Sequence, residues 1–316
     1  MDNHQIYVVE NEAANPMEGT FVMKGRIQTD KDNNWAIHAS TFEHDGQRYM
    51  IWCGWQKRRI DSETQCIYIA TMKNPWTLSS DRILISKPEY EWECQWVNPD
   101  GSKTAYPIHV NEAPQYFESK NKDKACIFYS ASGSWTPYYC VGLLTADAKA
   151  NLLNPASWKK SPVPVLQQDP ENNVYGPGGI SFTPSPDGKE WYMLYHARQI
   201  PNDAPGASDS RSPRLQKIDW DKDGMPVLGT PQKKRNQWQG HPVPLFIKNR
   251  TNYRLYSEAE IRTLHSSQVN DNLLNNDAGS PQRICKVCLP GFFTYKVDLF
   301  TLQFFNTLSY QIENIR

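Results

Sequence analysis

Hydrophobic and aromatic residues gather in short runs along the first 240 residues, and each run is bounded by Gly, Pro, Asn or Asp. Runs of this length predict β-strands, and none shows the 3.6-residue period of a helix. A polar turn stands directly before three of the runs, which indicates hairpins. These three strands are predicted over residues 48–53, 125–130 and 190–196.

An internal repeat combines a strand, a turn built on Asn-Pro and a second short strand. The Asn-Pro pairs begin at Asn15, Asn74 and Asn154, after predicted strands over 6–10, 66–70 and 139–145. Because proline keeps the preceding residue out of the helical region, each pair predicts a turn. Units of about four strands, repeated at periods of tens of residues, predict an all-β propeller.

A fourth, partial unit is predicted from strands over 214–220 and 225–229. The repeat ends at about Gly240, and the sequence beyond it shows no clear alternation. We therefore expect a partial propeller domain over residues 1–240. Residues 241–316 are predicted to be a poorly organised tail or a separate element.

Composition excludes some functional classes. Lys+Arg and Asp+Glu both number 34, so nothing in the charge favours a nucleic-acid or membrane-surface partner. The most apolar tail segment, 287–305, is interrupted by Lys296 and Asp298, which argues against a membrane span. The first five residues lack the basic and apolar regions of a signal peptide, so none is expected.

Seven cysteines cannot all pair, and the one close pair, Cys285 and Cys288, has no second pair or histidine beside it. No metal site is therefore predicted. Aromatic residues make up 12% of the chain, which suits both β cores and sugar-binding clefts.

Three segments carry candidate chemistry, and each opens or precedes an aromatic strand. They contain His38, Glu112 and the run from Gly176 to Gly179. Without further evidence, a histidine placed like His38 is more often a core residue, and a glutamate placed like Glu112 is more often solvated. The glycine run lacks the spacing of a phosphate-binding loop, so a tight turn into the next strand is expected.

The tryptophans either pack in the core or stack on sugar rings. Of these, Trp55 and Trp135 are candidate substrate-binding residues, together with Arg214.

Residues from His4 to about Pro231 resemble glycoside hydrolase family 43, in particular its α-L-arabinofuranosidase-like members, which are related to β-xylosidases. Five segments carry the resemblance in order: 33–37, 67–79, 110–112, 129–135 and 175–178. The resemblance implies a five-bladed propeller whose active site lies at one end of the central channel. It also implies an extracellular enzyme that acts on arabinose- or xylose-containing polysaccharides and needs no cofactor, although a structural calcium occurs in the family.

The family usually works by inversion with three carboxylates. An Asp on the first blade is the general base, a second Asp tunes the acid, and a Glu is the general acid that protonates the leaving oxygen. Glu112 falls on the position of the acid and His38 on that of the tuning Asp. Gly179 falls where a histidine often lines the channel centre.

Two departures from the family pattern follow. An imidazole at position 38 cannot keep Glu112 protonated by like-charge repulsion, and a protonated one favours the carboxylate. The general base should lie before residue 1, so the first blade is predicted to be absent and no base is identified. The tail is then interpreted as the remnant of an appended module.

Three hypotheses remain at this stage. The chain is a family 43 glycosidase by descent, a catalytically inactive or sugar-binding relic, or a protein-interaction propeller. The third is weakest because the repeats lack the Gly-His and Trp-Asp signatures of such arrays. Because each of their segments leads into an aromatic strand in a separate repeat unit, we also expect Glu112, His38 and Gly179 to meet at one end of the central channel.

Overall fold

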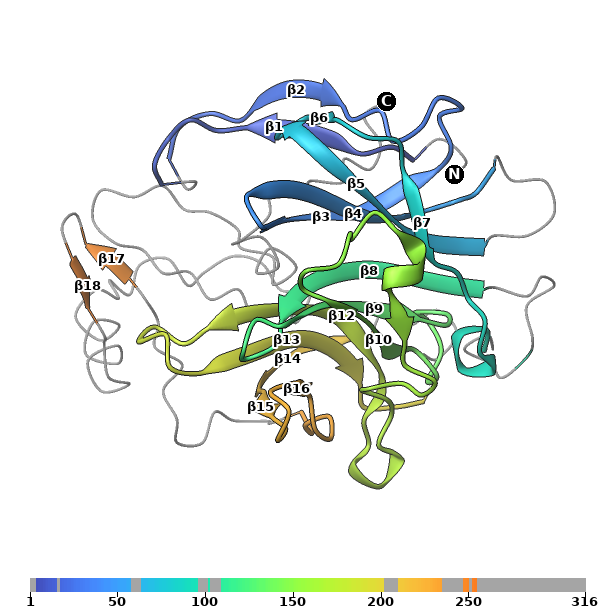
Figure 1. The fold of residues 1–316 in the computed structure, drawn as a ribbon. Coiled ribbons are helices and arrows are strands. Elements are labelled where there is room, and N and C mark those ends of the chain that lie inside the picture. The colour runs from blue at the N-terminus through green and yellow to red at the C-terminus, as the bar shows by residue number, and fades with distance from the viewer. Residues whose placement is uncertain are drawn as a thin grey trace, which may run out of the picture. The chain divides into compact units, whose positions relative to one another are not determined.

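The computed structural model describes residues 4–15, 18–57, 64–95, 102, 109–201 and 210–234, together with the backbone of 247–249 and 252–254. In this part of the chain the regular structure consists of β-strands and three single-turn 3₁₀ helices (Figure 1). The prediction of an all-β protein is confirmed.

The strands follow one another with short connections. They are β1 (Tyr7–Glu10), β2 (Val22–Arg26), β3 (Ala36–His44), β4 (Gln47–Gly54), β5 (Thr64–Asn74), β6 (Thr77–Leu78), β7 (Ile83–Ser86), β8 (His109–Glu118), β9 (Lys124–Ala131), β10 (Cys140–Asp147), β11 (Lys159–Lys160), β12 (Tyr175–Pro184), β13 (Trp191–Arg198), β14 (Ser212–Lys217), β15 (Asp219–Trp220), β16 (Pro226–Val227), β17 (Ile247–Asn249) and β18 (Asn252–Arg254). The 3₁₀ helices are η1 (Glu91–Glu93), η2 (Pro155–Ser157) and η3 (Pro170–Asn172).

Three antiparallel meanders form the body of the described fold. Strands β3, β4, β5 and β7 make the first, β8 to β11 the second, and β12 to β14 the third. A short parallel contact, Thr64 with His109 and Gln65 with Val110, joins the first meander to the second. The described strands pair in open sheets, so the pairing does not by itself define a number of blades.

The predicted turns at Asn74 and Asn154 are confirmed. The Asn74 side chain accepts a hydrogen bond from the amide of Trp76, and Asn154 caps η2 by accepting one from the amide of Ala156. Pro16, in the first Asn-Pro pair, lies outside the described residues. The predicted hairpin strands correspond to β4, β9 and β13.

The strand expected over 214–220 is confirmed except at Ile218, which separates β14 from β15. Another sequence prediction about local structure is wrong. The expected tight turn at 176–179 lies instead within strand β12. There Gly176 and Gly179 adopt positive φ and form irregularities of the strand rather than a turn.

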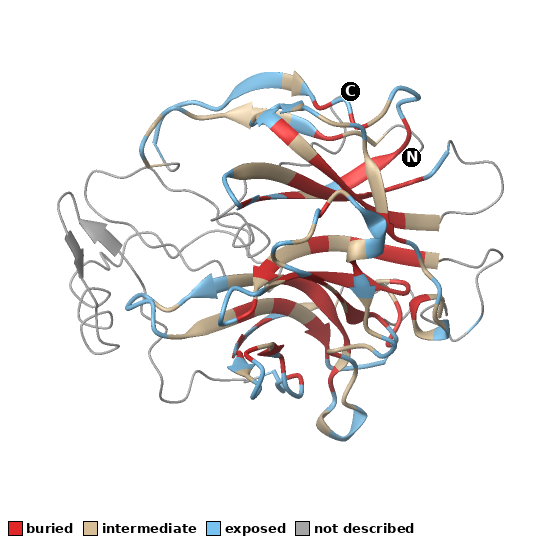
Figure 2. Ribbon diagram, in the orientation of Figure 1, coloured by how far each residue is buried: buried red, intermediate tan, exposed pale blue. Residues whose placement is uncertain are grey.

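The core lies between the meanders, and β9 contributes to it on both faces (Figure 2). Alternate side chains of a strand point to opposite sides, so a strand buried on both faces is hydrophobic throughout. One face of β9 packs in the cluster with β4 and β5, through Ala125, Ile127, Tyr129 and Ala131. The other face packs in the cluster with β12 and β13, through Cys126 and Phe128. Strand β9 therefore couples the first meander to the third.

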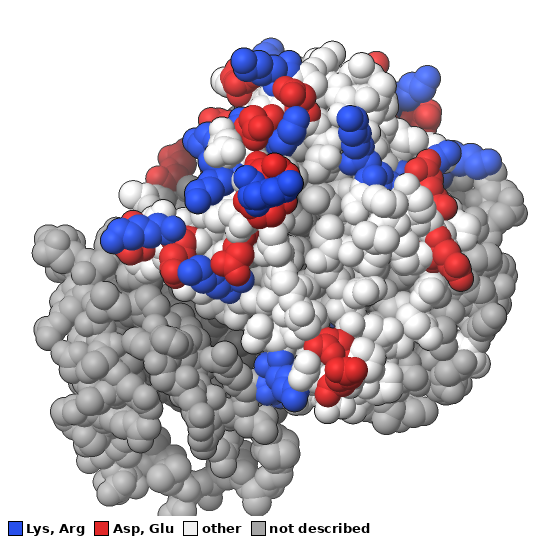
Figure 3. Space-filling view, turned by 60° about the horizontal axis from the view of Figure 1, so that its bottom comes forward, with Lys and Arg blue, Asp and Glu red and all other residues white. Residues whose placement is uncertain are grey.

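Described residues up to Lys234 belong to one compact unit, and β17 and β18 belong to a second. The predicted domain boundary near residue 240, most of the predicted tail, and Cys285 and Cys288 lie outside the described residues. No helix in the described part is long and apolar enough to cross a membrane. On the face shown in Figure 3, acidic and basic side chains are interspersed.

Candidate functional site

The first strand of each meander carries a left-handed residue at an equivalent place. His38, Ala113 and Gly179 have φ of 52°, 48° and 62°, and each stands where the register of its strand shifts. Left-handed conformations are uncommon outside glycine, and bulges of this kind often re-aim side chains at active sites. The repeat thus presents three irregular strand segments, and Glu112 directly precedes one of them.

Glu112 is buried, with 8% of its surface exposed. The Tyr139 hydroxyl donates a hydrogen bond to Glu112 Oε1 at 2.5 Å. On the other side, His38 Nδ1 lies 3.7 Å from Glu112 Oε2. The predicted proximity of His38 and Glu112 is therefore confirmed, while their catalytic roles remain predictions.

Tyr139 is held rigidly, and 2% of its surface is exposed. Its ring stacks on His196, with centroids 5.7 Å apart and planes at 4°. A Cβ atom added to Gly178 would lie 2.2 Å from Tyr139 Cε1, so only glycine fits at position 178. Burial, followed by the charge of Glu112, raises the pKa of the Tyr139 phenol far above its usual value. The phenol therefore remains a proton donor.

Gly179 reaches the same cluster through its backbone. Its amide donates to Ser130 Oγ at 2.9 Å, and Ser130 pairs with Glu112 across strands β8 and β9. Gly179 has no side chain to offer a metal, and no three His, Cys, Asp or Glu residues of the described ranges lie where they could hold one. The residues at this place do not fit the histidine-lined calcium position known from the family.

Cys53, on β4, also borders the site. Its sulfur lies 3.7 Å from His38 Nδ1 and 3.6 Å from Gln65 Oε1. Burial, followed by the charge of Glu112, raises the pKa of the Cys53 thiol well above its usual value. Cysteine needs the thiolate form to act as a nucleophile, so Cys53 is not suited to covalent catalysis.

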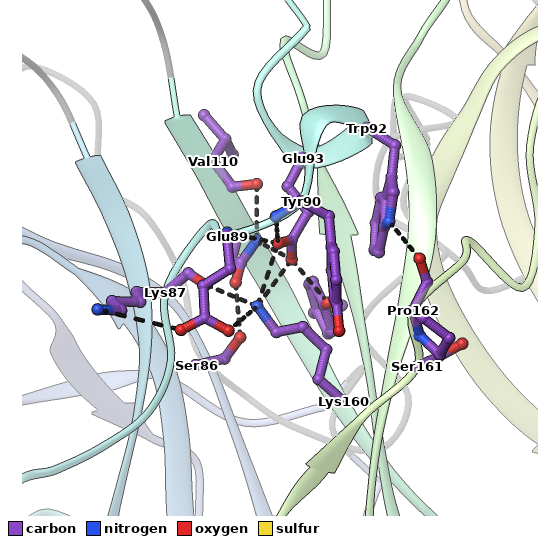
Figure 4. A network of polar contacts seen from close by, with 12 residues as sticks. Ser86, Lys87, Glu89, Tyr90, Trp92, Glu93, Val110, Lys160, Ser161 and Pro162 are labelled. Atoms are coloured by element: carbon purple, nitrogen blue, oxygen red, sulfur yellow. Dashed lines mark hydrogen bonds and ion pairs between the residues drawn. The ribbon is translucent and has the colours of Figure 1, made fainter.

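A buried polar network fixes β8 beside Glu112 (Figure 4). Glu93 is fully buried, and its carboxylate accepts hydrogen bonds from Asn111 Nδ2 at 2.9 Å and from Tyr129 at 2.8 Å. Lys160 Nζ, from β11, donates to the same carboxylate at 2.9 Å. Because Asn111 precedes Glu112 on the strand, this network anchors the backbone that carries the candidate acid.

The other candidate residues lie at different depths. Trp55 is 4% exposed and stacks on Trp35 at 5.1 Å, and Trp135 is half-buried against Gly133 in the loop between β9 and β10. Arg214 is buried and donates to the carbonyls of Ala197, Ser212 and Gln232. The roles of these three residues in substrate binding remain predictions.

The structure adds Tyr139 and Ser130 to the site, and sequence reasoning missed both. Tyr139 had been assigned only as the start of a predicted strand, and Ser130 only as the end of one. The signal that could have found Tyr139 is its position in the resemblance, four residues after the matched segment 129–135.

Comparisons with known proteins identify the family. Residues 1–226 match the sequence model of glycosyl hydrolases family 43. An extracellular exo-α-(1→5)-L-arabinofuranosidase from Streptomyces avermitilis is 38% identical over 229 residues, which are 72% of this chain and 44% of that protein. An α-L-arabinofuranosidase 43 from Humicola insolens is 37% identical over 288 residues, which are 90% of this chain and 55% of that protein.

The crystal structure of an α-L-arabinofuranosidase from Lactobacillus brevis superposes with a TM-score of 0.65 at 31% identity, and the match covers 75% of this chain and 69% of that one. The chain spans about half the length of the curated relatives it matches. The family match extends over more than half of the sequence and includes the strands that carry His38, Glu112 and Gly179. On this evidence the chain belongs to glycosyl hydrolases family 43.

Proposed function

We propose that the protein is a glycoside hydrolase by descent that recognises arabinose-containing polysaccharides, with Glu112 as its general acid. The observation that carries the proposal is the buried Glu112 carboxyl group, which meets Tyr139 and His38 on a strand matched to the family. The relatives named as arabinofuranosidases support arabinose as the sugar. Xylose-containing chains are the second proposed substrate.

The same geometry supports a second candidate function, sugar binding without turnover. An inverting glycosidase needs a base carboxylate roughly 6.5–9.5 Å from its acid, with room for a water between them. Among the described residues, the hydrogen bonds and ion pairs of Glu112 lead to a phenol and an imidazole, and none leads to a second carboxylate. A base at that separation would not contact Glu112, so our proposal that hydrolysis is slow rests on His38 standing at the position of the tuning Asp.

The further properties that we propose follow from the family. The fold is a five-bladed propeller type, and hydrolysis would proceed by acid–base chemistry without a cofactor. We further propose that the protein acts outside the cell, as the Streptomyces relative named extracellular does.

A paired binding and turnover measurement tests both functions. Purified protein and its Glu112→Gln variant are titrated with arabino-oligosaccharide in a calorimeter and assayed with an aryl α-L-arabinofuranoside. Turnover that Glu112→Gln removes supports the enzyme, and binding without turnover in both proteins supports the sugar-binding alternative. If neither protein binds or hydrolyses arabinosides or xylosides, both functions are wrong.

A further inference from the structure

The candidate site is most accessible on the side of His38. The His38 side chain is 37% exposed, while the Glu112 side chain is 10% exposed. Beside His38 lie Cys53, near the end of β4, and Gln65, near the start of β5. We call these three residues, His38, Cys53 and Gln65, the open edge of the site.

Short contacts connect Gln65 to Glu112 along the open edge. Gln65 Oε1 lies 3.6 Å from Cys53 Sγ, and Cys53 Sγ lies 3.7 Å from His38 Nδ1. His38 Nδ1 in turn lies 3.7 Å from Glu112 Oε2. An oligosaccharide that reaches Glu112 is therefore long enough to reach Gln65 as well.

We propose that Gln65 is a further substrate-binding residue, whose side-chain amide donates a hydrogen bond to a hydroxyl oxygen of an arabinose-containing chain bound at Glu112. The inference deepens the proposed function and rests on it. None of the substrate-binding residues predicted from the sequence lies on β5, so Gln65 adds a contact from a new element of the fold.

The Gln65 side-chain amide is held in one orientation. The Cys53 thiol donates to Gln65 Oε1, so the oxygen end of the amide faces Cys53. Burial raises the pKa of the Cys53 thiol well above its usual value, and the thiol therefore keeps this proton at neutral pH. The amide nitrogen then points away from Cys53, with two N–H groups to donate.

The nitrogen end of the amide is available to a ligand. In the described part of the chain, no acceptor pairs with Gln65 Nε2, and the nitrogen is not among the buried polar atoms that lack a partner. The buried Gln216 differs, because its Nε2 donates to the carbonyls of Leu228 and Thr230. A glutamine whose oxygen is held and whose nitrogen is accessible is suited to bind a sugar hydroxyl.

The fold also fixes the backbone of Gln65 next to the strand that carries Glu112. Gln65 pairs with Val110 in the short parallel contact between β5 and β8, and Val110 is two residues before Glu112. A binding group on a paired strand is placed more precisely than one on a loop. Gln65 is therefore a built-in donor at a constant place beside the candidate acid.

A double-mutant cycle between the protein and its ligand tests the inference. The purified protein and its Gln65→Met variant are titrated in a calorimeter with arabinotriose and with arabinotrioses that each lack one hydroxyl group. Gln65→Met should weaken the binding of arabinotriose by about 3- to 10-fold, as expected for the loss of one hydrogen bond between uncharged groups. One deoxy ligand should bind both proteins equally well, because the hydroxyl that Gln65 contacts is already absent.

Gln115→Met is the matched control. Gln115 is also a half-buried glutamine, but it lies on β8 beyond the irregularity at Ala113 and pairs with Phe128. Its replacement should leave the binding of arabinotriose unchanged. If Gln65→Met does not fold, Gln65→Glu takes its place, since it keeps the shape of the side chain and removes the amide donors.

Variants of Cys53 test the orientation of the amide. Cys53→Ala leaves the Gln65 amide without its donor and should weaken the binding of arabinotriose in the same direction as Gln65→Met, by a smaller factor. Cys53→Ser keeps a donor and should retain the binding. Unchanged binding in Cys53→Ala overturns the role of Cys53.

The remaining outcomes decide the role of Gln65. Unchanged binding in the Gln65 variant, or an equal loss in Gln115→Met, overturns it. A weakening by Gln65→Met that persists for every deoxy ligand also overturns it, because the contact then involves no ligand hydroxyl. A protein that binds no arabinotriose before any substitution overturns the proposed function and this inference together, and that failure is distinct from one confined to Gln65.

Discussion

The separation of 3.7 Å between His38 Nδ1 and Glu112 Oε2 makes position 38 the most sensitive residue near the candidate acid. His38→Asp would place a second carboxylate beside Glu112, and two close like charges favour protonation of one of them. We expect no gain of turnover, because a carboxylate at position 38 would tune the acid and would not activate the attacking water. His38→Asn is the uncharged control, and hydrolysis restored by His38→Asp alone would contradict this expectation.

A second prediction at the residue scale concerns the buried ion pair behind β8. Lys160→Met leaves the fully buried Glu93 carboxylate without its cation, and breaking a buried pair in this way costs about 3–5 kcal/mol. Urea unfolding should show this loss. Lys159→Met, at the exposed neighbouring residue of β11, should change stability by less than about 0.5 kcal/mol. Equal losses of stability in the two variants would show that the Lys160–Glu93 ion pair does not stabilise the fold.

Single residues also show where sequence reasoning succeeds and where it stops. The meeting of His38 and Glu112 could be predicted because both stand in corresponding segments of a repeat. The contact between Tyr139 and Glu112 could not, because the repeat marks Tyr139 only as the start of a strand, while packing against Gly178 and His196 places its side chain.

At the scale of elements, the irregular strand β12 makes the site possible. Gly178→Ala would drive a Cβ into the Tyr139 ring, and overpacking of this kind costs about 1–3 kcal/mol. Urea unfolding should show this loss of stability. Gly188→Ala is the contrasting control, since its Cβ meets open space and only its positive φ is strained. A Gly178→Ala protein with unchanged stability would contradict the close packing.

The elements show the limits of local pattern more generally. Hairpin strands β4, β9 and β13 follow from polar turns and hydrophobic runs, which are local signals. Strand β12 does not follow from local signals. Its glycines predict a turn because of their backbone freedom, but pairing with β13 keeps the chain extended.

For the whole molecule, the repeat predicts strand-rich units but does not predict how the meanders are joined. Their joining depends on contacts between strands of different meanders, such as the parallel link from β5 to β8. The clearest long-range coupling in the described fold is β9, whose two faces belong to two hydrophobic clusters.

This coupling predicts that the described fold up to residue 234 unfolds as one cooperative unit. Phe128→Ala removes a fully buried side chain from the cluster with β12 and β13, and such changes cost about 3–5 kcal/mol. Because Ile127 on the same strand belongs to the other cluster, amide protection in β4 and β5 should fall together with that in β13. Hydrogen exchange followed by mass spectrometry measures both regions at once, and Leu215→Ala, at an exposed residue of β14, should leave both unchanged. Loss of protection confined to β12 and β13 would show instead that the meanders unfold separately and that β9 does not transmit stability between them.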